Sequence, residues 1–93
     1  LSKLKSRLMA MSELNPLPPI DQTLDLSGLH CPLPILRTKK ALAVLASGNV
    51  VAVTATDPAA PADFAAFCKQ TGHTLLRSET LDNGKFWLVL QRR

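Results

Sequence analysis

Hydrophobic and polar positions along the chain follow different periods, and the changes between them predict six elements. A period of two predicts a half-buried strand, an unbroken β-branched run predicts a central strand, and apolar residues three and four apart predict a helix. The predicted elements are a strand at 22–28, a helix at 33–48, a strand at 49–57, a helix at 61–72 and strands at 73–81 and 85–91. Gly48 and Gly72 are expected to end the helices, and Asn83-Gly84 is a strong hairpin signal.

The order of these elements also predicts how the sheet is built. The first three form a βαβ unit, so the strands at 22–28 and 49–57 are expected to run parallel, while the hairpin adds antiparallel pairing. Two helices cannot cover both faces of four strands. The predicted fold class is therefore α+β: a two-layer β-α-β-α-β-β sandwich with a four-stranded mixed sheet and two helices on one face. The other face is expected to expose Val, Leu and Trp87 surface to a partner or a second copy.

The chain has 93 residues, enough for one domain. Residues 1–20, which end in the stiff NPLPPI, are expected to form a flexible N-terminal extension, and residues 21–93 the domain. The opening Leu1, with Met9 and Met11 nearby, leaves open whether part of the extension precedes the natural start.

Composition excludes several classes of function. The formal charge of +4 is spread along the chain, so no concentrated nucleic-acid footprint is expected. No apolar run approaches the ~20 residues that span a membrane. The two cysteines make no disulfide framework, and with the two histidines they lack the spacing of a zinc site. A cytoplasmic protein with free thiols and no metal is expected.

Cys31 is the candidate reactive residue, because it precedes Pro-Leu-Pro where the first predicted helix begins. The loop that holds it and the loop with Asp57 should leave the same edge of the sheet, where open α/β sheets bind ligands. Pro32, Leu33 and Pro34 are expected to form the helix N-terminus, with Cys31 as its N-cap. The helix dipole should then lower the pKa of the thiol.

No general base accompanies this thiol in the sequence. His30 is adjacent to Cys31, but neighbouring side chains on extended backbone point to opposite faces, and an exposed loop histidine is the expected alternative. A thiolate without acid–base machinery suits a protein that accepts a group on sulfur and hands it over, so turnover by this chain alone is not expected.

The stretches LDLSGLHCPLPILRTKKAL and TATDPAAPADFAAFC, with the closing hairpin, resemble the TusA/SirA-like sulfur carrier proteins over residues 21–93. The resemblance implies a sandwich like the C-terminal domain of bacterial translation initiation factor 3, with Cys31 carrying sulfur as a persulfide. It implies no other cofactor. It implies a cysteine desulfurase, a rhodanese or another persulfide protein as donor, and a sulfur-relay protein as acceptor, as in tRNA thiolation. Leu33 stands where some members have an acidic residue, which leaves the partner's identity open.

Several alternatives remain open from the sequence. Cys68 is expected to be a buried structural thiol, with a relay role as the alternative. Arg37, Lys39 and Lys40 either dock an acidic partner or solvate the outer helix face. Asp57 is expected to act first as a turn or cap residue, with partner docking as a further possibility. Cys31 as a redox or regulatory thiol is the second functional hypothesis. An RNA-binding module is the weakest, since no aromatic platform is present.

Overall fold

The computed structural model describes residues 17–93, and their elements follow the predicted order β-α-β-α-β-β. The elements are β1 Gln22–Leu26, α2 Leu33–Ala43, β2 Val50–Ala55, α3 Ala60–Thr71, β3 Thr74–Thr80 and β4 Phe86–Gln91. Residues 1–16 of the predicted extension lie outside the described residues, so the boundary at residue 20 stays a prediction. Within the described part of the chain, no helix is long and apolar enough to cross a membrane.

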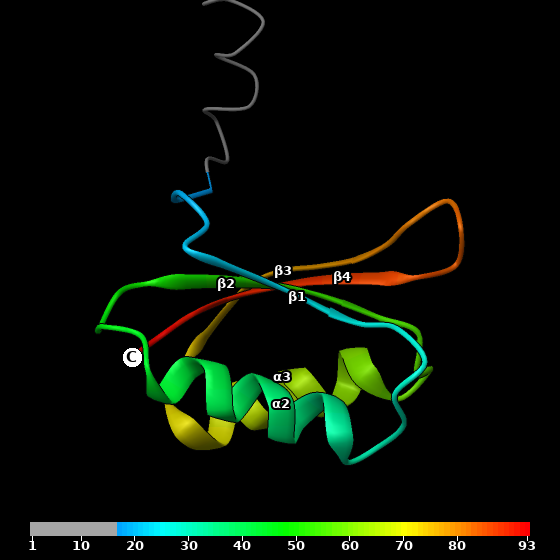
Figure 1. Cartoon of the computed structure of the whole chain (residues 1–93), viewed down its shortest axis with the longest axis horizontal. Helices are drawn as coiled ribbons and strands as arrows, with labels where there is room; N and C mark the ends of the chain where they lie inside the picture. The colour runs from blue at the N-terminus through cyan, green and yellow to red at the C-terminus, as the bar shows by residue number, and fades with distance from the viewer. Residues whose placement is uncertain (1–16) are drawn as a thin grey trace, which may run out of the picture.

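The sheet is mixed, as predicted, with the strand order β1-β2-β4-β3. β1 and β2 run parallel, with Leu24 opposite Val53, whereas β4 is antiparallel to both β2 and β3. Figure 1 shows both helices on one side of this sheet. The two-layer sandwich is therefore confirmed, and the carboxyl ends of β1 and β2 meet at one edge.

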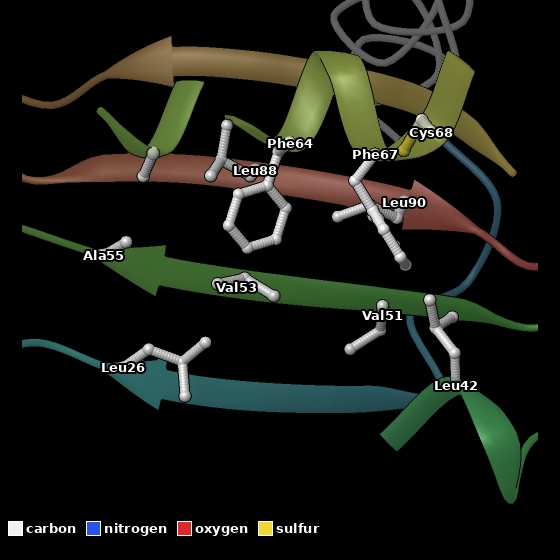
Figure 2. Close-up of a cluster of buried hydrophobic side chains, with 11 residues drawn as sticks. Leu26, Leu42, Val51, Val53, Ala55, Phe64, Phe67, Cys68, Leu88 and Leu90 are labelled. Carbon is white, nitrogen blue, oxygen red and sulfur yellow. The ribbon is translucent and has the colours of Figure 1, made fainter. Parts of the chain in front are cut away.

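The main core fills the space between the sheet and the helices (Figure 2). Its buried members are Leu26, Leu42, Val51, Val53, Ala55, Ala60, Phe64, Phe67, Cys68, Leu88 and Leu90. They come from three strands and both helices, with Phe64 fully buried. Because one aliphatic cluster with two phenylalanines joins all these elements, the positions of α2 and α3 depend on the same packing.

The opposite face of the sheet is less exposed than the sequence predicted. A second cluster there consists of buried Val50, Ala52 and Val89, with Leu17, Leu76 and Trp87 packed against it. The expectation was wrong for the valines, which neighbouring side chains, Leu17 among them, cover, whereas Leu76 and Trp87 are only partly buried and so leave some apolar surface exposed. Leu17 belongs to the predicted extension, so at least this residue of it contacts the domain.

Helix α2 ends five residues before the predicted stop at Gly48. Two contacts that sequence periodicity does not reveal explain the difference. The carbonyl oxygen of Leu42 accepts a hydrogen bond from Nε of Arg92, 50 residues away (2.9 Å). The N–H of Ala46 donates to Oδ1 of Asn49 (2.8 Å), which builds a turn in place of another helical turn.

The predictions at the other two glycines, Gly72 and Gly84, are confirmed. Gly72 ends α3 in the left-handed conformation, with φ 86°, and its N–H donates to the carbonyl of Cys68. Asn83-Gly84 lies in the turn between β3 and β4, where Oδ1 of Asn83 accepts a hydrogen bond from the N–H of Lys85 (3.0 Å).

Candidate functional site

Two loops meet at the sheet edge where β1 and β2 end (Figure 1). The N–H of Gly28 donates to Oγ1 of Thr56, and the N–H of Cys31 donates to Oδ2 of Asp57, both at 2.8 Å. These bonds join the segment before α2 to the segment before α3. The prediction that Cys31 and Asp57 leave the sheet from one edge is confirmed.

Asp57 is the buried junction between the loops. Its Oδ1 accepts a hydrogen bond from the N–H of Ala59 (3.1 Å), while its Oδ2 accepts the one from Cys31. These two backbone donors, Ala59 first, lower the pKa of the Asp57 carboxyl group. Only 9% of the residue is exposed, so it offers little area to a partner. Its position supports the turn role expected from the sequence and not the docking role.

The start of α2 differs from the prediction by one residue. Pro32 occupies the N-cap position, with no capping side-chain hydrogen bond, and Leu33 is the first helical residue. The N–H of Leu33 donates to the carbonyl of His30 (2.8 Å). This backbone turn uses the N–H group that a capping sulfur of Cys31 would have needed as its donor. Cys31 is therefore not the N-cap, and its peptide bond to Pro32 is cis. Pro34 is buried at the second helical position, and Leu33 is 43% exposed.

The thiol of Cys31 is free and exposed at one end of a shallow groove of about 240 Å³ between the two helices. The groove is lined by Cys31, Pro32, Ile35, Asp63, Ala66, Phe67 and Gln70. One wall comes from the start of α2 and the other from one face of α3. Most of the residues that line the groove with Cys31 are apolar, and Asp63 is the one carboxylate among them.

The surroundings of Cys31 raise the pKa of its thiol, opposite to the prediction. The largest cause of the raised pKa is the partial loss of water around the sulfur, although Cys31 as a whole residue is exposed. The hydrogen bond to Asp63 and the negative charges of Asp63 and Asp57 follow. A helix dipole contributes modestly at an exposed site, and Cys31 lies outside the helix it would depend on. The prediction of a lowered pKa was wrong because the loss of water around the sulfur, followed by the carboxylates of Asp63 and Asp57, outweighs the helix dipole.

Asp63 is the site residue that sequence reasoning missed. It lies in the first turn of α3 and accepts a hydrogen bond from the Cys31 thiol. A signal was available, because Asp63, Ala66, Phe67 and Gln70 follow helical spacing and line one wall of the groove.

The other predicted residues lie apart from the groove. Arg37, Lys39 and Lys40 are exposed on α2, and none of them lines the groove. His30 is exposed, as expected for a loop histidine. Cys68 is only 4% exposed within the core, and burial raises the pKa of its thiol to about 11. This environment agrees with the expected structural thiol.

Comparison with known proteins places this site in a family. A family model described as "Sulfurtransferase TusA" matches residues 22–92. The chain belongs to the TusA family. The sulfur carrier protein TusA of Allochromatium vinosum is 53% identical over 72 residues, which cover 77% of this chain and 93% of that protein. A Neisseria meningitidis protein named as a candidate sulfur carrier is 58% identical over 72 residues, or 77% of this chain and 96% of that one.

A solved structure also agrees with the TusA fold. The crystal structure of a SirA-like protein from Desulfitobacterium hafniense aligns with a TM-score of 0.68 and 28% sequence identity. The alignment covers 75% of this chain and 95% of that one. The resemblance to TusA/SirA-like proteins that the sequence indicated is thereby confirmed.

Proposed function

We propose that this TusA-family chain accepts sulfane sulfur as a persulfide on Cys31 and passes it to an acceptor protein. The observation that carries the proposal is the free, exposed thiol of Cys31 at the sheet edge, in a groove open to a second protein. The other cysteine, Cys68, is buried and cannot take that role without unfolding. The names of the relatives support the same reading.

Loading is a transfer between two sulfur atoms. The Cys31 thiolate attacks the outer sulfur of the donor's persulfide, so the Cys31 Sγ–S bond forms as the donor's S–S bond breaks. The donor leaves as a thiolate and takes up the proton that Cys31 gave. The oxidation state travels with the sulfane sulfur, so the step needs no oxidant or reductant. Delivery to the acceptor repeats the exchange in the other direction.

Asp63 acts on both forms of Cys31. In the unloaded protein its carboxylate adds to the loss of water around the sulfur in raising the pKa of the thiol, which lowers the fraction of thiolate. A persulfide is more acidic than its thiol. Its anion would lie beside the same carboxylate, and this like-charge repulsion raises the free energy of the loaded form, which opposes loading as much as it favours release.

The outer face of α2 next to Cys31 is the proposed partner surface. Leu33 and Leu36 are 43% and 51% exposed, and the exposed cations Arg37 and Lys40 follow on the same helix. The sequence of α2 contains no acidic residue. An apolar patch with a basic border suits an acidic partner surface on a cysteine desulfurase, a rhodanese or a relay protein. Relay toward tRNA thiolation is one such pathway.

The raised pKa of the Cys31 thiol gives no support to the redox alternative. Cysteines that sense oxidants are exposed thiols of low pKa, because the thiolate is the species that reacts. Cys31 is exposed but its pKa is raised.

The test is intact-mass analysis of wild type, Cys31→Ser and Cys68→Ala after incubation with a cysteine desulfurase and cysteine. We expect wild type and Cys68→Ala to gain the mass of one sulfur atom, which a reductant removes, and Cys31→Ser to gain none. No gain with this donor or with thiosulfate and a rhodanese would overturn the proposal.

A further inference from the structure

A second pocket is lined by residues at the C-terminal end of α2 and after β4. Figure 1 shows these two segments at the same end of the molecule. The pocket has a volume of about 200 Å³ and is lined by Lys39, Leu42, Ala43, His73, Arg92 and Arg93. The 11 residues of α2 span about 16 Å, which separates this pocket from Cys31. The proposed sulfur chemistry does not use it.

The charged side chains that line this pocket are all positive. Lys39 from α2 and Arg92 and Arg93 beyond β4 supply three cations, and no carboxylate side chain is among the lining residues. Among residues 17–93 the structure shows one ion pair, between Arg77 and Glu79, so none of the three cations is paired with a carboxylate there. Such a cluster attracts an anion by its field and offers it unshared donors.

Hydrogen bonds hold two of these residues in place. Nε of Arg92 donates to the carbonyl of Leu42 (2.9 Å), and its Nη1 donates to the carbonyl of Arg93 (3.2 Å), which leaves three of its five N–H groups. The first bond adds a second donor to the carbonyl of Leu42, which also accepts a hydrogen bond from the N–H of Leu45 (3.1 Å), so it places a positive charge beside the negative end of α2. The guanidinium of Arg92 is therefore already oriented before any ligand arrives.

His73 contributes a neutral donor. Its Nδ1 accepts a hydrogen bond from the backbone N–H of Arg93 (2.9 Å), so the neutral ring carries its proton on Nε2. Burial, followed by the charges of Arg93 and Arg92, lowers the pKa of this histidine, in agreement with that neutral form. Its ring also packs beside Phe67, with 5.6 Å between the ring centroids.

Gly72 makes room for the third cation. A Cβ atom built on this glycine would lie 2.9 Å from Cδ of Arg93, so the arginine stem crosses the end of α3 where a side chain would otherwise stand. The same residue has φ 86°, which favours glycine for a separate reason. Because Gly72 has no side chain, the stem of Arg93 can lie across the C-terminal end of α3.

We propose that this pocket binds a phosphate-type tetrahedral oxyanion. Arginine forks and a lysine ammonium are the side chains that bind phosphate oxygens. The donors come from α2, from His73 between α3 and β3 and from the residues after β4, a spread that suits a tetrahedral acceptor better than a planar carboxylate. The volume is below the ~300–1,000 Å³ of pockets that hold drug-sized ligands, so one anionic group is the appropriate size.

The test is an NMR titration of the full ¹⁵N-labelled chain with sodium phosphate and, separately, sodium sulfate. Sodium acetate at matched pH and ionic strength is the control anion. We expect saturable shifts at His73, Arg92 and Arg93 with the two tetrahedral anions but not with acetate. Arg93→Gln and Lys39→Gln, which each remove one positive charge, should weaken binding about tenfold.

Two matched variants separate a site from general electrostatics. Lys85→Gln removes the same charge in the β3–β4 hairpin and should leave the affinity within about twofold. Cys31→Ser should bind like wild type, so this test is independent of sulfur loading. An equal loss in Lys85→Gln and Arg93→Gln, or equal shifts with acetate, would overturn the proposal.

A second probe identifies the source of the phosphate group. A short RNA duplex that shifts the same residues, and that inorganic phosphate displaces, would place the group on a nucleic acid backbone. Saturation by inorganic phosphate without RNA binding would make a free oxyanion the ligand. Absence of saturable shifts with phosphate, sulfate and RNA would contradict the site itself.

Discussion

At the scale of single residues, the surroundings of Cys31 lower the reactivity of its thiol. The groove removes part of its water and Asp63 accepts its hydrogen bond, and both raise its pKa. At neutral pH the unloaded protein therefore contains less thiolate than a free cysteine would. The smaller fraction of thiolate suits a carrier, because Cys31 stays unreactive toward small oxidants until a partner covers it.

Removal of the carboxylate at Asp63 should make the Cys31 thiol more reactive. In Asp63→Asn the thiol loses its hydrogen-bond acceptor and a nearby negative charge, so its pKa should fall. We expect a severalfold faster reaction of Cys31 with iodoacetamide at neutral pH, and a rate–pH profile displaced toward lower pH. Asp82→Asn in the distant hairpin is the matched control. Identical profiles for wild type and Asp63→Asn would show that the carboxylate does not act on the thiol.

The two cysteines should differ in reactivity by their burial. Cys68 is 4% exposed and the pKa of its thiol is raised to about 11, so the folded protein should take up one alkyl group, on Cys31. In denaturant both thiols should react. Mass spectrometry counts the groups, and Cys31→Ser should remain unlabelled until it unfolds. Fast labelling of Cys68 in the native protein would contradict the structural role assigned to it.

At the scale of elements, Asp57 joins the two loops that present the site. Its pKa is lowered in the folded state, so its contribution to stability is complete above the unfolded pKa of about 3.9 and is lost as the pH falls through the folded value. Asp57→Asn, which cannot ionise, should unfold at lower denaturant than wild type at pH 7. The gap between the two should close in acid.

Urea unfolding at several pH values measures this gap. Asp21 and Asp25 also have lowered pKa values, but they are present in both proteins and cancel in the difference. A gap that stayed constant down to pH 2 would mean that the charge of Asp57 is not what holds the loops.

Helix α2 presents the proposed docking face. Arg37 and Lys40 are exposed there, outside the groove of Cys31. The double change Arg37→Glu with Lys40→Glu should slow persulfide transfer from an acidic donor about tenfold or more, because association is steered by opposite charges. Alkylation of Cys31 by a neutral reagent should be unchanged. The matched variant Lys69→Glu on α3 should transfer sulfur at close to the wild-type rate, and equal slowing in both would indicate general charge repulsion.

At the scale of the whole molecule, local patterns predicted the order of elements, and long-range contacts decided the details. Alternation and helical spacing are local, so the six elements and the parallel pair followed from the sequence. The end of α2 depends on Arg92, 50 residues away, which no local period reveals. The raised pKa at Cys31 comes first from the loss of water around the sulfur and then from Asp63, which becomes its neighbour only when α3 packs beside α2. The position of Cys31 near a helix start followed from the sequence, but the loss of water and the carboxylate of Asp63 did not.

The fold itself depends on one shared core, and Phe64 is its largest fully buried side chain (Figure 2). Phe64→Ala should cost about 3–5 kcal/mol. That is a large share of the roughly 4–11 kcal/mol expected for a domain of this size. The denaturation midpoint should fall sharply, whereas Val44→Ala, at a position 83% exposed, should leave it nearly unchanged.

The same variant links the core to the site. Because the cluster around Phe64 includes Phe67 and Cys68, and Phe67 lines the groove, loosening it should expose Cys68 and distort the wall that faces Cys31. In Phe64→Ala we therefore expect Cys68 to be alkylated without denaturant, together with weaker sulfur loading of Cys31. Protection of Cys68 at the wild-type level in this variant would show that the groove wall does not rely on the core beneath it.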